Sequence, residues 1–232
     1  MPMKPLEFDR RYGELDQVIS AYLGRPVDGA EDAEEGPDEA LLAYLRHTWH
    51  TRPWALGIAE QQVREYARNP PGRLRLSLGE FYPVPDVGLP ESMIQDWLFR
   101  IADHLKGSIE DGAVPPPAVP RTHWEWRARF PELAQLLGGW FSQDMPDEFA
   151  DHDAALGDYA RSTQPQLVAR AVGELAEFLA LGLDEPDCVL ALAELGMEVD
   201  PPAPYAPSSW LGLVSERLAA RADSGRPADP ER

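Results

Sequence analysis

One stretch in the last third of the chain decides the fold class: Gln166-Leu-Val-Ala-Arg-Ala-Val-Gly-Glu-Leu-Ala-Glu-Phe-Leu-Ala-Leu181. Val168, Val172, Leu175 and Leu179 recur at intervals of four, three and four residues, which is the apolar stripe of an amphipathic helix. Such a helix needs partners that cover its stripe. The stretch therefore predicts a packed, mainly α-helical fold.

Other segments show the same period. Apolar residues repeat with helical spacing over residues 94–105, and Gly107 is a suitable residue to end that helix. Residues 188–195 and 210–218 predict two more helices. Residues 73–78 alternate arginine or serine with leucine, which is also compatible with a strand. We assign them to a helix because their counterpart in the second half has a helical pattern.

The two halves of the chain resemble each other. Residues 8–23 align with residues 126–141 through an aromatic residue and a shared Glu-Leu-x-Gln. Further pairs follow in the same order: residues 38–46 with 153–161, 53–60 with 165–172, and 97–105 with 210–218. Paired positions stay between 112 and 118 residues apart. We therefore predict a diverged tandem duplication of a small helical module.

Three consecutive prolines, Pro115 to Pro117, mark a boundary between these modules because they cannot continue a helix. We predict a diverged module over residues 1–112 and a Pro-rich linker over residues 113–122. A second module follows over residues 123–222, and residues 223–232 form a flexible tail.

The charge balance restricts the partners. The 232 residues carry 40 acidic and 21 basic side chains, a formal net charge of −19. This excess disfavours direct binding to nucleic acid, which needs clustered Lys and Arg, and docking on an anionic membrane. It favours a basic protein partner.

The sequence also indicates the compartment. The early residues lack the apolar region of a secretory signal, and no apolar run is long enough to span a membrane. The single cysteine excludes an internal disulfide framework. We expect a cytoplasmic protein.

Candidate catalytic and metal-binding residues are few. His47 and His50 are three residues apart, but no third ligand stands at a recognisable spacing, so we interpret them as helix-end residues. Cys188 lies in an apolar segment beside acidic residues, which predicts a buried, unreactive thiol. Gly138 and Gly139 lie within an apolar run and indicate close helix packing or a kink, not a phosphate loop. We therefore expect no catalytic residue, no metal and no cofactor: the chain is predicted not to be an enzyme.

Two acidic clusters follow the first apolar helix of each module. Neither cluster contains Lys or Arg, and like charges at this density repel each other. A solvated loop would explain one acidic cluster. The recurrence of such a cluster at matched positions of the two modules favours partner binding. The predicted partner-binding residues are Asp144, Asp147, Glu148, Asp151 and Asp153 in the second module and Glu31, Asp32, Glu34 and Glu35 in the first.

Trp124 and Trp126 lie between the linker and the first predicted helix of the second module. An aromatic pair at that place can pack in a core, join the two modules or contact a partner. We favour packing.

The second module resembles a known family, most clearly over about residues 129–218. The segment Arg129-Phe-Pro-Glu-Leu-Ala-Gln-Leu-Leu-Gly-Gly-Trp-Phe-Ser-Gln-Asp144 is similar to the opening of the immunity proteins of bacterial contact-dependent growth-inhibition systems, the CdiI type. Further features fit in order: Asp151 and Asp153, the helix of residues 166–181, Leu195-Gly196, Asp200-Pro201, Trp210-Leu211, Val214 and Leu218. Ser142 departs from the bulkier residue expected there, and the first module keeps only the skeleton.

The resemblance implies an inhibitor that binds the toxin domain of a contact-dependent inhibition or related polymorphic toxin effector. Many such toxins are nucleases with basic clefts, which an acidic protein suits because carboxylates can replace phosphates and steer association. The alternative function is an acidic DNA mimic or regulatory adaptor that binds a basic host protein.

Overall fold

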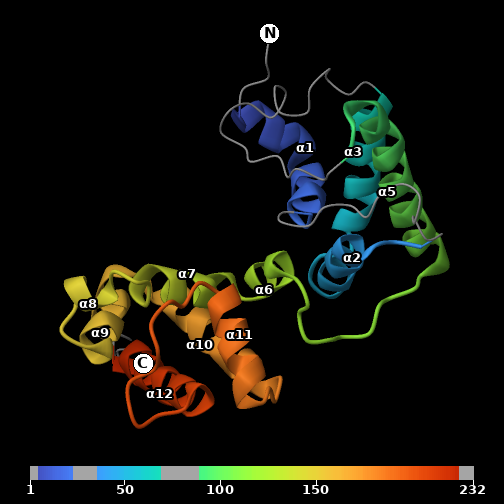
Figure 1. Cartoon of the computed structure of the whole chain (residues 1–232). Coiled ribbons are helices and arrows are strands. Elements are labelled where there is room, and N and C mark those ends of the chain that lie inside the picture. The colour runs from blue at the N-terminus through green and yellow to red at the C-terminus, as the bar shows by residue number, and fades with distance from the viewer. Residues whose placement is uncertain (1–4, 23–35, 69–88, 225–232) are drawn as a thin grey trace, which may run out of the picture. The chain divides into compact units, whose positions relative to one another are not determined.

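The computed structural model describes residues 5–22, 36–68 and 89–224, and these ranges contain helices and no strand (Figure 1). The mainly α-helical prediction is confirmed. The chain divides into two compact units, Met1–Glu125 and Trp126–Arg232, here called the N-terminal and C-terminal units. The division falls inside helix α6 (His123–Arg129). Residues 113–121, which include the three consecutive prolines, form neither helix nor strand.

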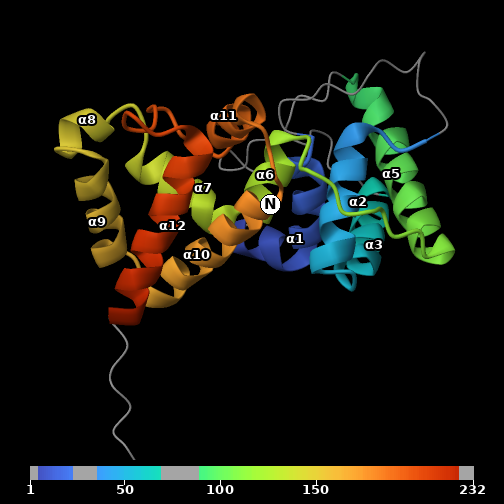
Figure 2. The same ribbon diagram turned by 90° about the horizontal axis from the view of Figure 1, so that it is seen from below.

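In the N-terminal unit, the described residues before α6 form α1 (Pro5–Ser20), α2 (Glu39–Thr51), α3 (Ala55–Arg68) and α5 (Glu91–Asp111). Helix α3 runs beside both α1 and α5 (Figures 1 and 2). Together the helices enclose a core whose completely buried members include Leu15, Val18, Leu56, Val63, Leu98 and Leu105.

The long helix α5 corrects one prediction. It passes through Gly107 and ends at Asp111, where Gly112 adopts the left-handed conformation with φ 59° and ψ 26°. Glycine adopts that conformation without the steric penalty of a side chain, so Gly112 is the terminating residue. A Cβ on Gly107 would meet no other atom within 4 Å, and this glycine is tolerated inside the helix. Residues 73–78 lie outside the described residues.

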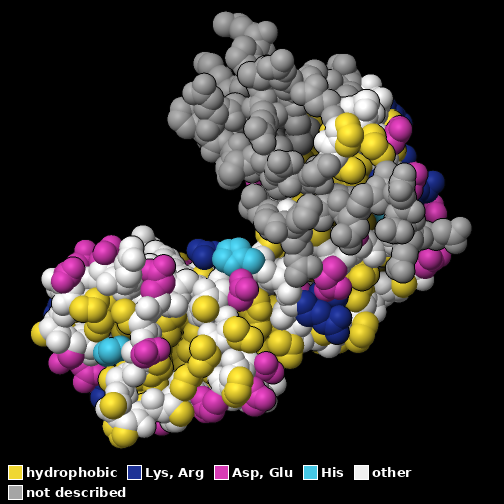
Figure 3. Space-filling view, viewed as in Figure 1, with side chains coloured by type: hydrophobic (Ala, Val, Ile, Leu, Met, Phe, Trp, Pro, Cys, Tyr) yellow, Lys and Arg dark blue, Asp and Glu magenta, His cyan; other side chains and the backbone are white. Residues whose placement is uncertain are grey.

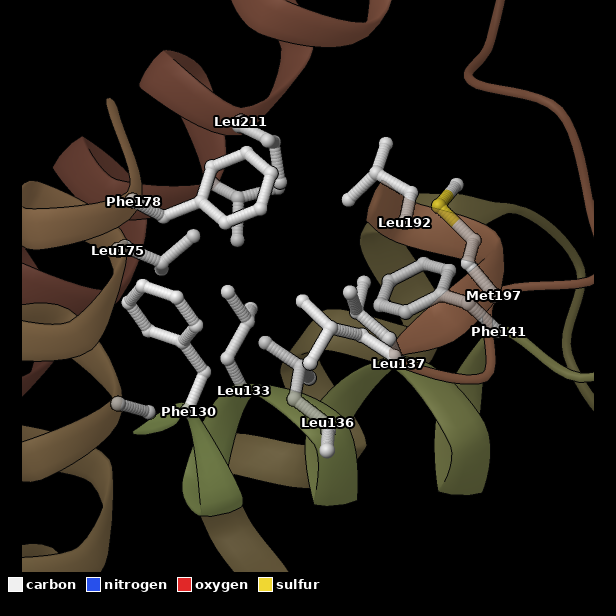
Figure 4. Packing of buried hydrophobic residues seen from close by; sticks show 14 of the residues in the cluster. Phe130, Leu133, Leu136, Leu137, Phe141, Leu175, Phe178, Leu192, Met197 and Leu211 are labelled. Carbon is white, nitrogen blue, oxygen red and sulfur yellow. The ribbon is translucent and has the colours of Figure 1, made fainter. Parts of the chain in front are cut away.

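The C-terminal unit contains six helices after α6 in its described part: α7 (Pro131–Trp140), α8 (Met145–Glu148), α9 (His152–Ser162), α10 (Pro165–Ala180), α11 (Glu185–Glu194) and α12 (Pro207–Ser224). Their core is apolar and rich in aromatic rings (Figure 4). Phe130 packs edge-on against Phe178 of α10 with ring centroids 5.7 Å apart. Phe141 packs edge-on against Trp210 of α12 at 5.1 Å. The two ends of α7 are thus attached to α10 and to α12.

The buried face of α10 differs slightly from the predicted stripe. Val168, Ala171, Leu175 and Phe178 are buried, whereas Leu179 is 36% exposed. Phe178 and Leu179 are adjacent, so both fit the helical period approximately. Phe178 is the residue that faces the core, where it packs against Phe130.

The two tryptophans of α6 serve separate cores. Both lie inside this helix and not before it, which corrects the predicted position. Trp124 packs against the core of the N-terminal unit, with its ring centroid 5.9 Å from that of Tyr44. Trp126 is 6% exposed and belongs to the core of the C-terminal unit.

Contacts recur at positions that the alignment of the two halves pairs. Arg11 forms an ion pair with Glu65, and the matching Arg129 pairs with Glu177 at 2.7 Å. Each arginine also lies over the aromatic ring that follows it, at 5.2 Å for Tyr12 and 5.3 Å for Phe130.

The same aromatic residues pack against matching partners. The Tyr12 and Tyr66 rings meet edge-on at 5.3 Å, as Phe130 and Phe178 do. Tyr12, with φ −133°, breaks α1 into two helical parts at the position where Phe130, with φ −125°, separates α6 from α7.

A polar side chain caps the second helical part in each unit. The Gln62 side-chain oxygen accepts hydrogen bonds from the amides of Glu14 and Leu15 at 2.9 and 3.0 Å. The matching Glu174 carboxylate accepts one from the Leu133 amide at 2.8 Å. These amides have no partner within the helix, so an acceptor stabilises them. Glutamine does so without a charge, whereas glutamate must place a partly buried carboxyl there.

The pKa of the Glu174 carboxyl is raised from 4.5 to about 7, chiefly by this burial. Backbone hydrogen bonds lower the pKa, and the nearby Glu132 carboxylate raises it. Because the folded pKa is above the unfolded one, the folded state binds this proton more tightly. Stability therefore falls as pH rises from about 4.5 to 7 and stays reduced above it.

Replacing Glu174 with the glutamine of the matching position should remove this penalty. We expect Glu174→Gln to raise the free energy of unfolding by about 1 kcal/mol at pH 8, after allowing for solvent screening. The gain should shrink towards pH 5, where the wild-type carboxyl is protonated. Chemical unfolding of the full chain at pH 5, 6.5 and 8 measures this. Glu177→Gln, which loses the ion pair with Arg129, is the control and should show no gain at pH 8.

Helix α7 and the end of α11 approach each other at two glycines. A Cβ on Gly196 would stand 3.1 Å from the Gly138 Cα, and Gly196 has φ 97°. Both the contact and the backbone conformation require glycine here. Close packing, as predicted from the sequence, is thus confirmed for Gly138, while Gly139 has open space.

We expect Gly196→Ala to lower the free energy of unfolding by about 2 kcal/mol, because a methyl group would combine backbone strain with a clash. Gly139→Ala is the matched control and should be neutral or slightly stabilising, since alanine favours the helix. Thermal and urea unfolding compare the two variants. Equal stability of both would contradict the close approach.

Candidate partner-binding surface

Local sequence places the acidic cluster of the second module on a short helix and the start of the next. Helix α8 begins at Met145, with Pro146 in its first turn, and ends after Glu148. Asp151 has extended backbone (φ −165°, ψ 176°), and its carboxylate accepts a hydrogen bond from the Ala154 amide at 2.8 Å. Asp151 is therefore the N-cap that begins α9.

All five predicted residues of this cluster are exposed, and the structure brings them together at one end of the C-terminal unit. We call them the acidic patch: Asp144, Asp147, Glu148, Asp151 and Asp153. Figure 3 shows acidic side chains gathered over the α8 and α9 end of this unit. Their exposure leaves them accessible to a partner.

A distant part of the sequence, residues 198–200, lies beside the acidic patch. Glu198 accepts a hydrogen bond from the Gln143 amide at 2.9 Å, and its own amide donates to the Phe141 carbonyl at 2.9 Å. The Asp200 carbonyl lies 2.9 Å from Nε2 of His152. Nothing local in the sequence shows that residues 198–200 lie beside α8, because a tertiary contact places them there.

The residues of the acidic patch differ in the contacts that their side chains make with the rest of the protein. Asp151 caps α9, and Asp153 pairs with Arg217 of α12. Within the described part of the chain, the side chains of Asp144, Asp147 and Glu148 make neither an ion pair nor a hydrogen bond. These three can bind a cation without first breaking an internal contact.

The predicted cluster of the first module is Glu31, Asp32, Glu34 and Glu35, and it lies outside the described residues. Its neighbours Asp38 and Glu39 are described. Asp38 caps α2 by accepting from the Leu41 amide at 2.9 Å, and Glu39 pairs with the largely buried Arg46 at 2.7 Å.

The two histidines and the cysteine considered as catalytic candidates either contact neighbouring residues or are buried. Nε2 of His50 lies 2.8 Å from the Pro115 carbonyl, and the His47 ring packs edge-on against Trp124 at 5.4 Å. Cys188 is 1% exposed, and its burial, with the Glu185 carboxylate, raises the pKa of the thiol to about 11. A thiol at that pKa is not a nucleophile at neutral pH.

Metal-site and membrane-span features are absent from the described ranges. In them, no three His, Cys, Asp or Glu side chains gather into a possible metal site. None of the helices there combines the length and apolar character of a membrane span.

The capping role of Asp151 is separable from its charge. We expect Asp151→Ala to lower the free energy of unfolding by about 1 kcal/mol, because the Ala154 amide loses its acceptor. Asp147→Ala removes an equal charge without a contact and should stay within about 0.5 kcal/mol of the wild type. Urea unfolding followed by circular dichroism compares them. An equal loss in both variants would contradict the cap.

The C-terminal unit matches the model of a known protein family. Residues 129–218 match the family described as CdiI immunity protein. The match begins at the residue before Phe130, contains the whole acidic patch, and ends within α12. No curated protein and no solved structure matches the chain. The C-terminal unit is thus similar, over most of its length, to the CdiI immunity proteins of contact-dependent growth inhibition.

Proposed function

We propose that this chain is an immunity protein that binds and neutralises the toxin domain of a contact-dependent inhibition or related polymorphic toxin effector. The observation that carries the proposal is the family match over residues 129–218. Inhibition by binding needs no catalytic group. A buried thiol and structurally engaged histidines are compatible with such a protein.

Charge supplies the mode of recognition. The net charge of −19 creates a long-range field that attracts a basic partner, such as a nuclease whose cleft binds phosphates. Asp144, Asp147 and Glu148 are exposed, and their side chains make no ion pair or hydrogen bond with the described residues. They therefore provide the carboxylates that meet Lys or Arg. Steering of this kind raises the association rate and makes it sensitive to salt.

The N-terminal unit enters the proposal as a diverged copy of the C-terminal unit. Matching ion pairs, ring contacts and helix caps support this relation, because they recur at the positions that the sequence alignment pairs. The second acidic cluster, with Glu31 and Asp32, is then a second candidate surface for the same class of partner.

A pull-down tests the proposed function. The tagged full-length chain is mixed with the purified C-terminal domain of the effector encoded beside it, at low and at high salt. We expect stable capture that weakens at high salt. If this domain is not captured but a basic host protein is, the function is that of a DNA mimic or regulatory adaptor instead.

Charge reversal tests the acidic patch. We expect Asp147→Lys/Glu148→Lys to slow association about tenfold at low salt, with a smaller difference at high salt, because steering is screened. Stopped-flow or surface plasmon resonance measures the rates. Glu110→Lys/Asp111→Lys changes two adjacent exposed carboxylates of α5 by the same total charge and is the control. An equal slowing by both variants would assign the effect to net charge and not to the acidic patch.

A further inference from the structure

Helix α11 is apolar on both of its faces. Cys188, Ala191 and Leu192 point into the core and are at most 3% exposed. On the opposite side Val189 is 52% exposed and Leu190 is 65% exposed. An exposed apolar face on a helix often marks a contact surface, so the outer face of α11 has this character.

Within the described part of the C-terminal unit, no element covers this outer face. Helix α11 packs mainly on α12, through its inner side. Leu179, near the end of α10, is also 36% exposed, so a further apolar side chain is exposed shortly before α11 begins. Figure 3 shows hydrophobic side chains over the α11 region with acidic side chains beside them.

The chain segment around α11 is acidic, and Arg127 of α6 is a cation near the end of this helix, with its Nη1 3.8 Å from the place of a Cβ on Gly196. Residues 171–216 contain nine Asp and Glu residues and no Lys, Arg or His. Asp184 caps α11 by accepting from the Asp187 amide at 2.9 Å, and Glu185 accepts hydrogen bonds from Ser208 of α12. An apolar face on a mainly acidic segment disfavours a second copy of itself and favours a partner whose apolar contact is bordered by Lys and Arg.

The segment that follows α11 reaches the edge of the acidic patch. The helix ends at Glu194, and Glu198 already bonds to Phe141 and Gln143, just before the start of α8. The chain that leaves α11 therefore runs to the segment that precedes α8.

We propose that Val189 and Leu190 form the apolar anchor of the toxin-binding interface, with the acidic patch as its steering region. The proposal rests on the proposed function, since it names the same toxin domain as partner. Apolar anchors at the centre of an interface set the dissociation rate, whereas charges at its border set the association rate. The two surfaces thus have different kinetic signatures.

The test is Val189→Ser/Leu190→Ser in the full-length chain, titrated with the purified C-terminal domain of the neighbouring effector. We expect dissociation to become at least about tenfold faster, with the association rate and its salt dependence unchanged. Val114→Ser/Val119→Ser removes two valines that are 51% and 40% exposed and is the control, for which no change is expected.

Folding is checked by circular dichroism and the thermal midpoint. The milder Leu190→Ala keeps a strong helix former and should speed dissociation about threefold, so the proposal does not depend on the double variant alone. Wild-type dissociation rates in both α11 variants, with the toxin domain still bound, would overturn the anchor and leave the proposed function intact. Failure of the wild-type chain to bind the toxin domain would overturn the proposed function, and the anchor with it.

Discussion

The attachment of α10 to the beginning of α7 organises the C-terminal unit. Three contacts make it: Glu174 accepts from the Leu133 amide, Arg129 pairs with Glu177, and Phe130 packs on Phe178. They fix the direction in which α7 leaves Phe130. The far end of α7 then sets where Phe141 meets Trp210, and therefore where α8, α9 and α12 stand.

The acidic patch depends on this frame. Dense carboxylates repel each other and do not hold themselves together, so neighbouring structure must supply their positions. Asp151 gains a backbone amide, Asp153 gains Arg217, and the chain around Glu198 bonds to Phe141 and Gln143. The remaining carboxylates stay exposed on a surface that the core has already fixed. Because the backbone that carries them is already fixed, only their side chains lose conformational freedom when a basic partner binds.

The two units share contacts at the positions where their sequences are similar. Arg11, Tyr12 and Gln62 repeat the arrangement of Arg129, Phe130 and Glu174, including the interruption of the helix between its two parts. The units differ where the charge differs: Gln62 caps without a charge, whereas burial raises the pKa of Glu174 to about 7. The N-terminal unit thus has the matching contact without its electrostatic cost.

Local periodicity in the sequence determined the helical fold, the buried state of Cys188 and the acidic segment of residues 144–153, because each depends on residues close together in the chain. Tertiary structure decided what depends on distant partners. It buried Phe178 in place of its neighbour Leu179, and it placed residues 198–200 beside the acidic patch. Within the described part of the C-terminal unit it also left the outer face of α11 uncovered, because covering a helix requires a second element and no pattern within one helix specifies it.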